Sequence, residues 1–165
     1  MDNDSIAIVL GDFRNALSQA LVAELNTELT GQYKEPGATH FALDPEQLAP
    51  GRGAFLVVYL EGAPVGCGAV RLLDANTAEL KRMFIKQPLR GQGLGRRLVV
   101  ALEQAARDLG ARQLVLETGI YQLAALALYR AVGFQAIPLY GEYVSSPATS
   151  ICLGKAVVIA PAAGG

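Results

Sequence analysis

The sequence predicts an α/β fold in which a mixed, mostly antiparallel sheet of about seven strands is flanked by about four helices. Two observations lead to this fold class. Short apolar, β-branched runs alternate with long stripes of helical period, and three of the runs follow one another with only short turns between them, as in an antiparallel meander. The 165 residues have the length of a single domain, which we expect to span residues 1–165.

The first third of the chain predicts a strand, a helix and a long connection. Residues 6–10 are a short apolar run and predict the first strand. Leucines recur every four residues over 17–29, which predicts a helix that begins after Asp12 as its N-cap. Residues 32–53 show no period and carry several prolines and glycines, although Asp44-Pro45-Glu46 is typical of the start of a short helix.

The rest of the chain completes the sheet and supplies two further helices. Apolar residues of helical period predict helices over 94–109, which Gly110 ends, and over 122–132, which Gly133 ends. Small residues follow the last apolar run, and we expect residues 156–165 to form a flexible tail. The remaining strands are predicted at 55–60, 64–73, 78–85, 113–118, 134–138 and 150–155.

Composition and charge exclude several classes of protein. The 14 Lys and Arg residues against 15 Asp and Glu give a net charge of −1, so we expect no nucleic-acid partner. The N-terminus lacks a secretory pattern, and no segment reaches the roughly 20 apolar residues of a membrane span, so we expect a cytoplasmic protein with no membrane partner. Cys67, Cys152 and the single histidine, His40, are too few for a metal site, and we expect no metal. Apolar strand edges are compatible with a homodimer.

A basic, glycine-rich segment at 81–97 predicts an anion site. It contains six of the 14 Lys and Arg residues and no acid, and Gly91, Gly93 and Gly95 open the helix that follows. The first N–H groups of a helix have no intrahelical partner and carry the positive end of its dipole, so they bind phosphate where glycines let it approach. Nucleotide motifs fit poorly, because Arg96 stands where a P-loop has lysine and the third glycine is misplaced for a dinucleotide fold.

Two blocks of residues resemble the GNAT superfamily of N-acetyltransferases. Arg90-x-x-Gly93-x-Gly95 is similar to the family's loop for the pyrophosphate of acetyl-CoA. Gln122-x-x-Ala125-x-x-Leu128-Tyr129-x-x-x-Gly133-Phe134 is similar to a second family block, with Gln122 in place of the usual Asn. The resemblance implies acetyl-CoA as the acetyl donor and a cofactor site made of Met83, Phe84, Ile85, Arg90, Gly91, Gln92, Gly93, Leu94, Gly95, Arg96, Gln122, Ala125 and Tyr129.

Direct acetylation of an amine requires a base and an acid. Tyr129 is the candidate acid, because a phenol keeps its proton at neutral pH and the resemblance places this residue near the sulfur of CoA. Glu79 is the candidate base, since glutamates near this position serve as bases in some members of the family, and Glu117 is the second choice. A pairing of Glu79 with Lys81 on one strand face, or a chain of waters that relays the proton, stays open at this point.

The acceptor and the activity leave alternatives. Tyr33, Glu117, Tyr140 and Tyr143 are candidates for the acceptor pocket, since aromatic walls with an acid suit a small amine. We expect an N-acetyltransferase that moves the acetyl group to a primary amine, on a small or amino-acid-like metabolite, in a ternary complex. An acyl-enzyme on cysteine lacks a set of catalytic partners. A protein N-terminal or lysine acetyltransferase, and a non-catalytic acyl-CoA sensor or interaction module, are the alternatives.

Overall fold

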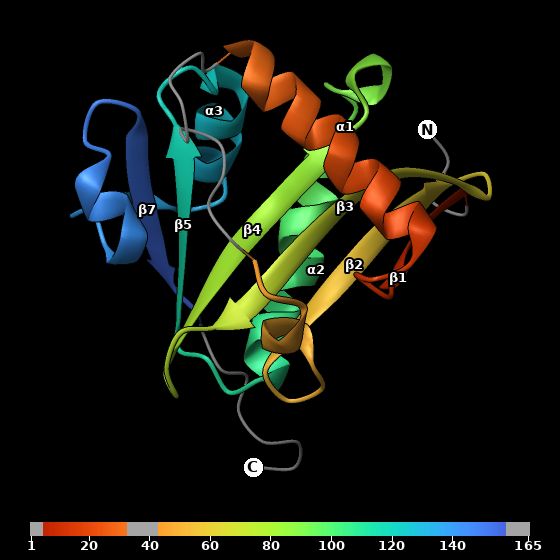
Figure 1. Ribbon diagram of the computed structural model, residues 1–165. Helices are drawn as coiled ribbons and strands as arrows, with labels where there is room; N and C mark the ends of the chain where they lie inside the picture. Colours follow the sequence, from red (N-terminus) through yellow and green to blue (C-terminus); the bar gives the residue numbers. More distant parts are fainter. Residues whose placement is uncertain (1–4, 33–42, 158–165) are drawn as a thin grey trace.

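The computed structural model describes residues 5–32 and 43–157, and its centre is a seven-stranded sheet (Figure 1). The strand order is β1-β2-β3-β4-β5-β7-β6, so strands that follow one another in the chain are neighbours except where β7 lies between β5 and β6. Every predicted strand is present within two residues of its expected bounds. The strands are β1 (Ile6–Leu10), β2 (Gly53–Leu60), β3 (Ala63–Leu72), β4 (Thr77–Ile85), β5 (Gln113–Gly119), β6 (Gln135–Ile137) and β7 (Ser150–Ala156).

Strand directions confirm the predicted fold class. Within the described residues, β4 and β5 pair in parallel, and each of the other neighbouring pairs is antiparallel. The parallel pair follows from the chain order, because a helix connects β4 to β5 and returns the chain to the same end of the sheet. The sheet is therefore mixed and mostly antiparallel.

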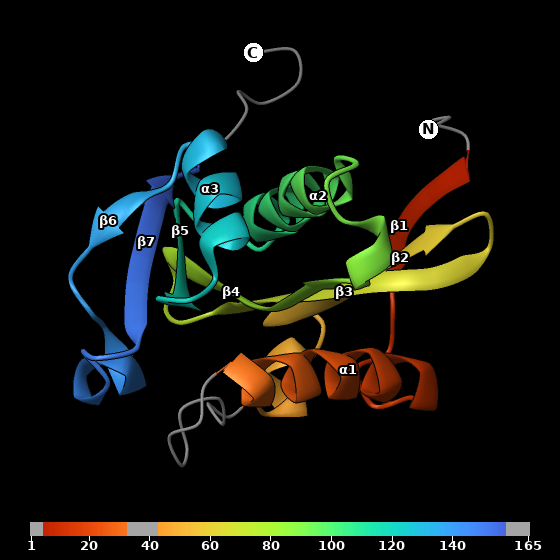
Figure 2. The ribbon, with the colours of Figure 1, turned by 90° about the horizontal axis from the view of Figure 1, so that it is seen from above.

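Helices cover both faces of the sheet (Figure 2). α1 (Ala16–Gln32) lies on one face, and α2 (Leu94–Asp108) and α3 (Leu123–Ala131) lie on the other. These are the α-helices of the described residues, fewer than the expected four or so. The segment that begins at Asp44 forms a 3-10 turn, Pro45–Leu48, rather than an α-helix, because its capping box is followed by only four helical residues.

The N-cap of α1 is Asn15 rather than Asp12. Oδ1 of Asn15 accepts a hydrogen bond from the backbone N–H of Ser18 at 2.8 Å, which is the contact of an N-cap with the first turn. Asp12 instead closes the turn that precedes the helix, where its Oδ1 accepts from the N–H of Arg14 at 2.9 Å. Aspartate and asparagine both suit an N-cap. Asn15 is the cap because it directly precedes Ala16, the first residue of the helix, and can reach the N–H group of Ser18 in the first turn.

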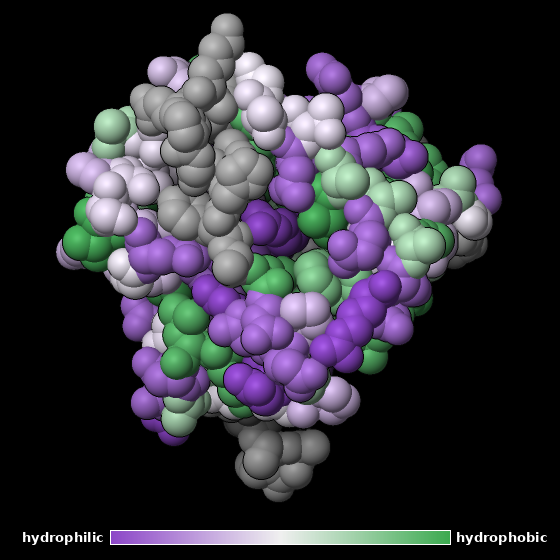
Figure 3. All heavy atoms as spheres, viewed as in Figure 1, coloured by the Kyte–Doolittle hydropathy of each residue, from purple (hydrophilic) through white to green (hydrophobic). Residues whose placement is uncertain are grey.

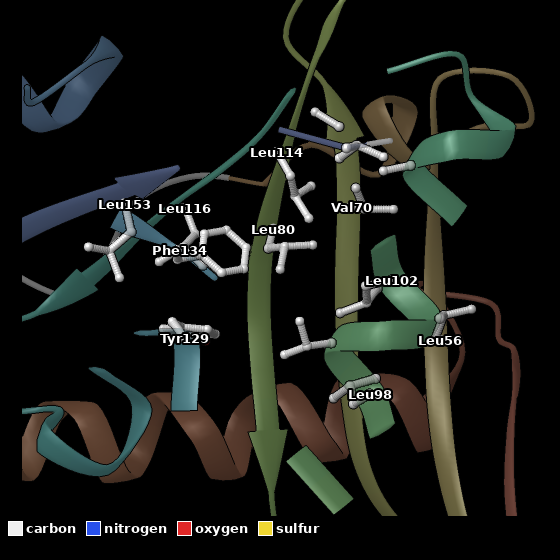
Figure 4. Packing of buried hydrophobic residues seen from close by; sticks show 14 of the residues in the cluster. Leu56, Val70, Leu80, Leu98, Leu102, Leu114, Leu116, Tyr129, Phe134 and Leu153 are labelled. Carbon is white, nitrogen blue, oxygen red and sulfur yellow. The ribbon is translucent and has the colours of Figure 1, made fainter. Parts of the chain in front are cut away.

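Two apolar cores hold the layers together. The larger lies between the sheet and the helices α2 and α3, and it contains fully buried leucines such as Leu98, Leu102 and Leu114 (Figure 4). Burying a leucine stabilises the fold by about 1.5–3 kcal/mol. Figure 4 also shows Tyr129 beside Phe134, and their rings meet edge to face with 5.7 Å between centroids. The smaller core lies between α1 and the opposite face of the sheet.

Regular structure continues into the beginning of the predicted tail. β7 extends to Ala156, and Val157 is 4% exposed and packs in the larger core. Residues 158–165, which make up the rest of the predicted tail, lie outside the described residues.

β4 and β5 separate along their length, and this separation positions the site. Their pairing ends at Leu80 and Leu116, while β4 continues to Ile85 and β5 to Gly119. The register between β3 and β4 shifts just beyond this point, where Arg82 adopts a left-handed conformation with a φ of 57°. Figure 1 shows the two strands diverging towards the side where α3 and the end of α1 lie. The last residues of β4 and β5 are therefore not paired with each other, and a gap separates the two strands at this end of the sheet.

Candidate active site

Two adjoining cavities occupy the region where β4 and β5 separate. The larger, of about 410 Å³, runs past the end of β4 to the start of α2. The smaller, of about 130 Å³, lies between the separated strands. The space-filling view shows a recess on the α1 face with hydrophilic atoms at its floor (Figure 3). Because Leu25, Met83, Gln122, Ala125 and Tyr129 line both cavities, molecules bound in the two would meet at these residues.

The first turn of α2 has the features of an anion site at one end of the larger cavity. Gly93 is the N-cap in a left-handed conformation with a φ of 87°, and it has no side chain to cap the first N–H groups of the helix. A Cβ at Gly91 or Gly93 would meet open space, so positive φ is the reason that these positions favour glycine. The first turn carries Arg96 and no acid, the reverse of what the helix dipole alone favours. A bound polyphosphate would satisfy both the free N–H groups and the positive charge.

Arg90 is held at the larger cavity by two contacts. Its Nε donates to the carbonyl oxygen of Ile85 at 2.8 Å, and its Nη2 lies 2.9 Å from Oε2 of Glu28 on α1. The guanidinium also lies 5.7 Å from the ring centroid of Phe84. Glu28 lines the same cavity, so its carboxylate lies near the first turn of α2 and binds one N–H group of Arg90.

The structure brings nearly all of the predicted cofactor residues to the larger cavity. Gln92 is exposed and does not line it. The sequence pattern missed Leu25 and Glu28, because the stripe of α1 reads as core and only the tertiary packing brings its last turns to this groove. The predicted residues that line the cavity are Met83, Phe84, Ile85, Arg90, Gly91, Gly93, Leu94, Gly95, Arg96, Gln122, Ala125 and Tyr129.

Tyr129 lies at the junction of the two cavities with its proton retained. Its side chain is buried, and its hydroxyl donates to Sδ of Met83 at 3.5 Å, a weak hydrogen bond that a bound ligand can replace. Burial, with a smaller contribution from the charge of Glu117, raises the pKa of Tyr129. The phenol is therefore a hydrogen-bond donor throughout the neutral range.

The two candidate bases have different surroundings. Glu117 lines the smaller cavity, and burial raises its pKa to about 7, against the opposing effect of Lys81. Glu79 is 1% exposed and lines neither cavity. Its Oε1 lies 2.9 Å from Nη2 of Arg71, and its Oε2 accepts a hydrogen bond from the Tyr140 hydroxyl at 2.5 Å. The geometry favours Glu117 over Glu79 as the group that takes a proton from a ligand.

The bond to Glu79 anchors the segment that closes the smaller cavity. Tyr140 precedes the 3-10 turn Gly141–Ser145, and its hydroxyl ties that turn to β4. Glu142 of the turn lies 3.2 Å from Nζ of Lys81, and the ring centroid of Tyr143 lies 5.7 Å from the same atom. Glu79 therefore lies outside the cavity and contacts the segment that lines it.

The predicted acceptor residues separate into three groups. Glu117 and Tyr143 line the smaller cavity, and Tyr140 lies behind it in the bond to Glu79. Tyr33 lies outside the described residues. The sequence pattern assigned Lys81 and Arg82 to the basic segment and missed their place here. The gap between β4 and β5 and the bulge at Arg82 arise from pairing between distant strands, which local spacing does not show. The other polar residues of the lining are Thr118, Gln122, Tyr129, Thr149 and Ser150.

The cysteines are core residues. Cys67 and Cys152 are 0% and 1% exposed, and neither lines a cavity. Burial raises the pKa of the Cys67 thiol to about 12 and also raises the pKa of Cys152. Both therefore stay as thiols, and neither is poised as a nucleophile.

Neither a metal-binding cluster nor a membrane-spanning helix is present in the described ranges. Residues 5–32 and 43–157 contain no group of three or more His, Cys, Asp and Glu side chains arranged to hold a metal ion. In the same part of the chain, no helix combines the length and the hydropathy needed to cross a bilayer.

We expect Arg96→Gln to weaken the binding of CoA about tenfold. A hydrogen bond to a charged group contributes about 1.5–3 kcal/mol, and the low end of this range applies because the Arg96 side chain is exposed. Glu28→Gln removes the carboxylate that faces the same site and should shift the affinity in the opposite direction. Isothermal titration with CoA at low ionic strength measures both changes. Arg130→Gln, an exposed arginine that does not line the cavity, is the matched control. If all three variants bind CoA as tightly as the natural protein does, the phosphates of CoA do not bind at this end of the groove.

Known proteins that are similar to this chain identify it as an acyltransferase. A model of the acetyltransferase (GNAT) family matches residues 18–134, and the chain belongs to this family. An IAA acetyltransferase from Azospirillum brasilense is 39% identical over 128 residues, which cover 77% of this chain and 82% of the relative. The resemblance that the sequence shows, and its classification as a GNAT-type N-acetyltransferase, are therefore confirmed.

Solved structures agree with this assignment. A provisionally named acyl-CoA N-acyltransferase from Klebsiella pneumoniae subsp. pneumoniae MGH 78578 is 34% identical and superposes with a TM-score of 0.80, covering 94% of this chain and all of the other. A GNAT family acetyltransferase from Elizabethkingia anophelis, solved with acetyl-CoA bound, has a TM-score of 0.67 at 18% identity over 93% of this chain and 99% of the other. The second similarity is one of fold.

Proposed function

We propose that the protein transfers the acetyl group of acetyl-CoA directly to a primary amine on a small, amino-acid-like metabolite. One observation carries the proposal: a groove that ends in an anion site meets a small pocket with a proton acceptor, and Tyr129 lies at their junction. Acetyl-CoA supplies the activated acetyl group. The first turn of α2, with Arg90 and Arg96, would hold its phosphates, and Met83 to Ile85 would line the path of its arm.

Each proton movement has a group of this chain to serve it. An alkylammonium ion has a pKa near 10.4 and must lose a proton before it can attack. Glu117, whose pKa burial raises to about 7, is a much better proton acceptor than an ordinary carboxylate and lines the acceptor pocket. The Tyr129 hydroxyl would donate a hydrogen bond to the departing sulfur, whose acid has a pKa near 8.5. Glu117 and Tyr129 thus act as base and acid.

Direct transfer is favoured over an acyl-enzyme. Cys67 and Cys152 are buried away from both cavities with raised thiol pKa values. The cavities instead share a wall, which suits a donor and an acceptor bound together. The reaction would then proceed in a ternary complex.

The size of the acceptor pocket supports a metabolite. Its volume of about 130 Å³ is small beside the roughly 300–1,000 Å³ of pockets for drug-sized ligands. A lysine side chain or an N-terminus of a protein is the alternative acceptor, and the pocket would have to admit it from a larger surface. The relative from Azospirillum brasilense is named for IAA, so IAA belongs among the compounds tested first.

Release of the CoA thiol from acetyl-CoA tests the proposal. The panel holds amino acids, their amides, polyamines, arylamines, IAA and lysine peptides. Saturable release with small amines supports the proposal, and preference for peptides favours the protein acetyltransferase. A sample that binds acetyl-CoA by titration but releases no thiol with any acceptor overturns the proposal and favours a non-catalytic acyl-CoA sensor.

A further inference from the structure

Opposite charges line the walls of the acceptor pocket. Lys81 and Arg82 come from β4, and Glu117 comes from β5 across the gap between the two strands. Lys81 already lies 3.2 Å from Glu142, with its side chain 5% exposed. Arg82 lines the same small cavity and supplies a second positive charge there.

Arg82 is placed in the pocket by an unusual backbone conformation. Its φ of 57° lies in the left-handed region that residues with a side chain seldom adopt, and it marks the shift in register on β4. A bulge of this kind redirects a side chain out of the regular alternation of a strand. Arg82 lines the smaller cavity together with Glu117 and Tyr143. The charges of Glu142, Glu117 and Arg71 act on it there.

An anion bound in the pocket would stabilise the charged form of Arg82, which burial disfavours. Burial disfavours the charged guanidinium and lowers its pKa, and the charges of Glu142 and Glu117 counter this only in part. Glu117 becomes neutral whenever it takes a proton, which removes one of these partners at the moment of reaction. A guanidinium has five N–H donors in a planar fork that matches a carboxylate, so one side chain can bond to the protein and to a ligand at the same time.

We propose that the acceptor carries a carboxylate as well as its amine, and that Arg82 binds the carboxylate while the amine faces Glu117. This inference rests on the proposed function and specifies its substrate class as amino acids and related zwitterions. The same charge disfavours polyamines and aminoglycosides, because a second ammonium group would lie close to Arg82 and Lys81.

Three matched acceptors test the inference: an amino acid, its amide and its decarboxylated amine. The amide keeps the α-amino group without the carboxylate, and its amine is less basic, so more of it is unprotonated near neutral pH. Amine ionisation alone therefore favours the amide, and a preference for the amino acid reports recognition of the carboxylate. We expect kcat/KM to be about 30-fold higher for the amino acid than for the amide, since charge-assisted hydrogen bonds contribute about 1.5–3 kcal/mol. Equal turnover of amino acid and amide overturns the inference and leaves the proposed function intact. Turnover of none of the three, nor of any other amine, overturns the proposed function.

The variant Arg82→Gln assigns the recognition to its residue. We expect KM for the amino acid to rise about 30-fold and KM for the amide to stay the same. Because Arg82 lowers the pKa of Glu117, any change in kcat should be shared by the two acceptors. Arg82→Lys keeps the charge but loses the fork, and it should recover part of the loss. Arg112→Gln, at an exposed site on the opposite end of β5, is the control. Titration with CoA checks that each variant is folded. Equal losses for amino acid and amide in Arg82→Gln would show a structural role and overturn the assignment.

Discussion

Replacing Glu117 with glutamine should lower kcat by about 10²–10⁴-fold, the range of general acid–base catalysis. The amide has the size and polarity of the carboxylate but cannot accept a proton from the attacking ammonium group. Because Glu117 lines the acceptor pocket and not the phosphate end of the groove, the affinity for acetyl-CoA should be nearly unchanged. Single-turnover kinetics with the preferred amine, together with titration of CoA, measures the two quantities.

The pH profile links this loss to the ionisation of Glu117. Its pKa is raised to about 7 by burial and by the charges of Glu79 and Glu142, while Lys81 and Arg82 act in the opposite direction. The base works when ionised, so kcat/KM of the natural protein should rise with pH through about 7. Glu117→Gln should lose this limb. A second limb that follows the pKa of the acceptor amine is recognised because it moves when the acceptor is changed.

The raised pKa of Glu117 also predicts that Glu117→Gln, although it inactivates the enzyme, makes the folded protein more stable. The pKa of Glu117 rises from 4.5 to about 7, so between these values the folded protein binds more protons than the unfolded chain. Stability of the natural protein should therefore fall as pH rises from about 4.5 to about 7 and then level off. Glu117→Gln removes that fall and should be more stable at pH 8 by ~2–3 kcal/mol, with little difference near pH 4. Urea unfolding at the two pH values checks the sign.

Glu79→Gln is the control that separates the two glutamates. An amide cannot accept both the Arg71 and the Tyr140 hydrogen bonds as a carboxylate does, and the Arg71 side chain is only 12% exposed. We expect a loss of stability of ~2–4 kcal/mol, as when one partner of a buried pair is removed, and a higher KM for the acceptor. The limb near pH 7 should remain. If Glu79→Gln loses the limb and Glu117→Gln keeps it, Glu79 is the base and the assignment is reversed.

The order of elements could be predicted from the sequence because each element carries its own local signal. The helical stripe through Leu94, Leu98 and Leu102 lies on α2 as expected, and all three side chains are fully buried. The misassigned cap of α1 shows where local signals stop. Asp12 and Asn15 are equally good caps by residue type, and the path of the chain out of β1 decides between them.

The two halves of the site differ in how far the sequence could predict them. The phosphate end is contiguous in the chain, so the glycines and arginines at 90–96 are recognisable as one motif. The base is not local. Glu79 and Glu117 are both carboxylates on neighbouring central strands, and their roles differ because Arg71 and Tyr140 reach the first and leave the second to the pocket. Such partners come from distant parts of the chain, and spacing alone does not show them.

Replacing Tyr129 with phenylalanine should lower kcat by about 10²–10³-fold, the effect of removing one hydrogen-bond donor from a developing anion. Burial raises the pKa of the hydroxyl, so it remains a donor over the whole range in which Glu117 ionises. The variant should therefore keep the limb near pH 7 at a lower level of activity. Single-turnover rates across pH 5.5–9, about two units either side of neutrality, distinguish this pattern from that of Glu117→Gln.

Loss of folding does not account for such a rate, because the hydroxyl contributes little to the fold. Its hydrogen bond goes to the sulfur of Met83 at 3.5 Å, and the ring that packs against Phe134 is kept in phenylalanine. We expect stability to change by less than ~1 kcal/mol and the affinity for CoA to stay nearly constant. Tyr59→Phe, on β2 and outside both cavities, is the matched control and should have full activity. An unchanged single-turnover rate in Tyr129→Phe would remove the hydroxyl from the chemistry and leave the ring with its packing role alone.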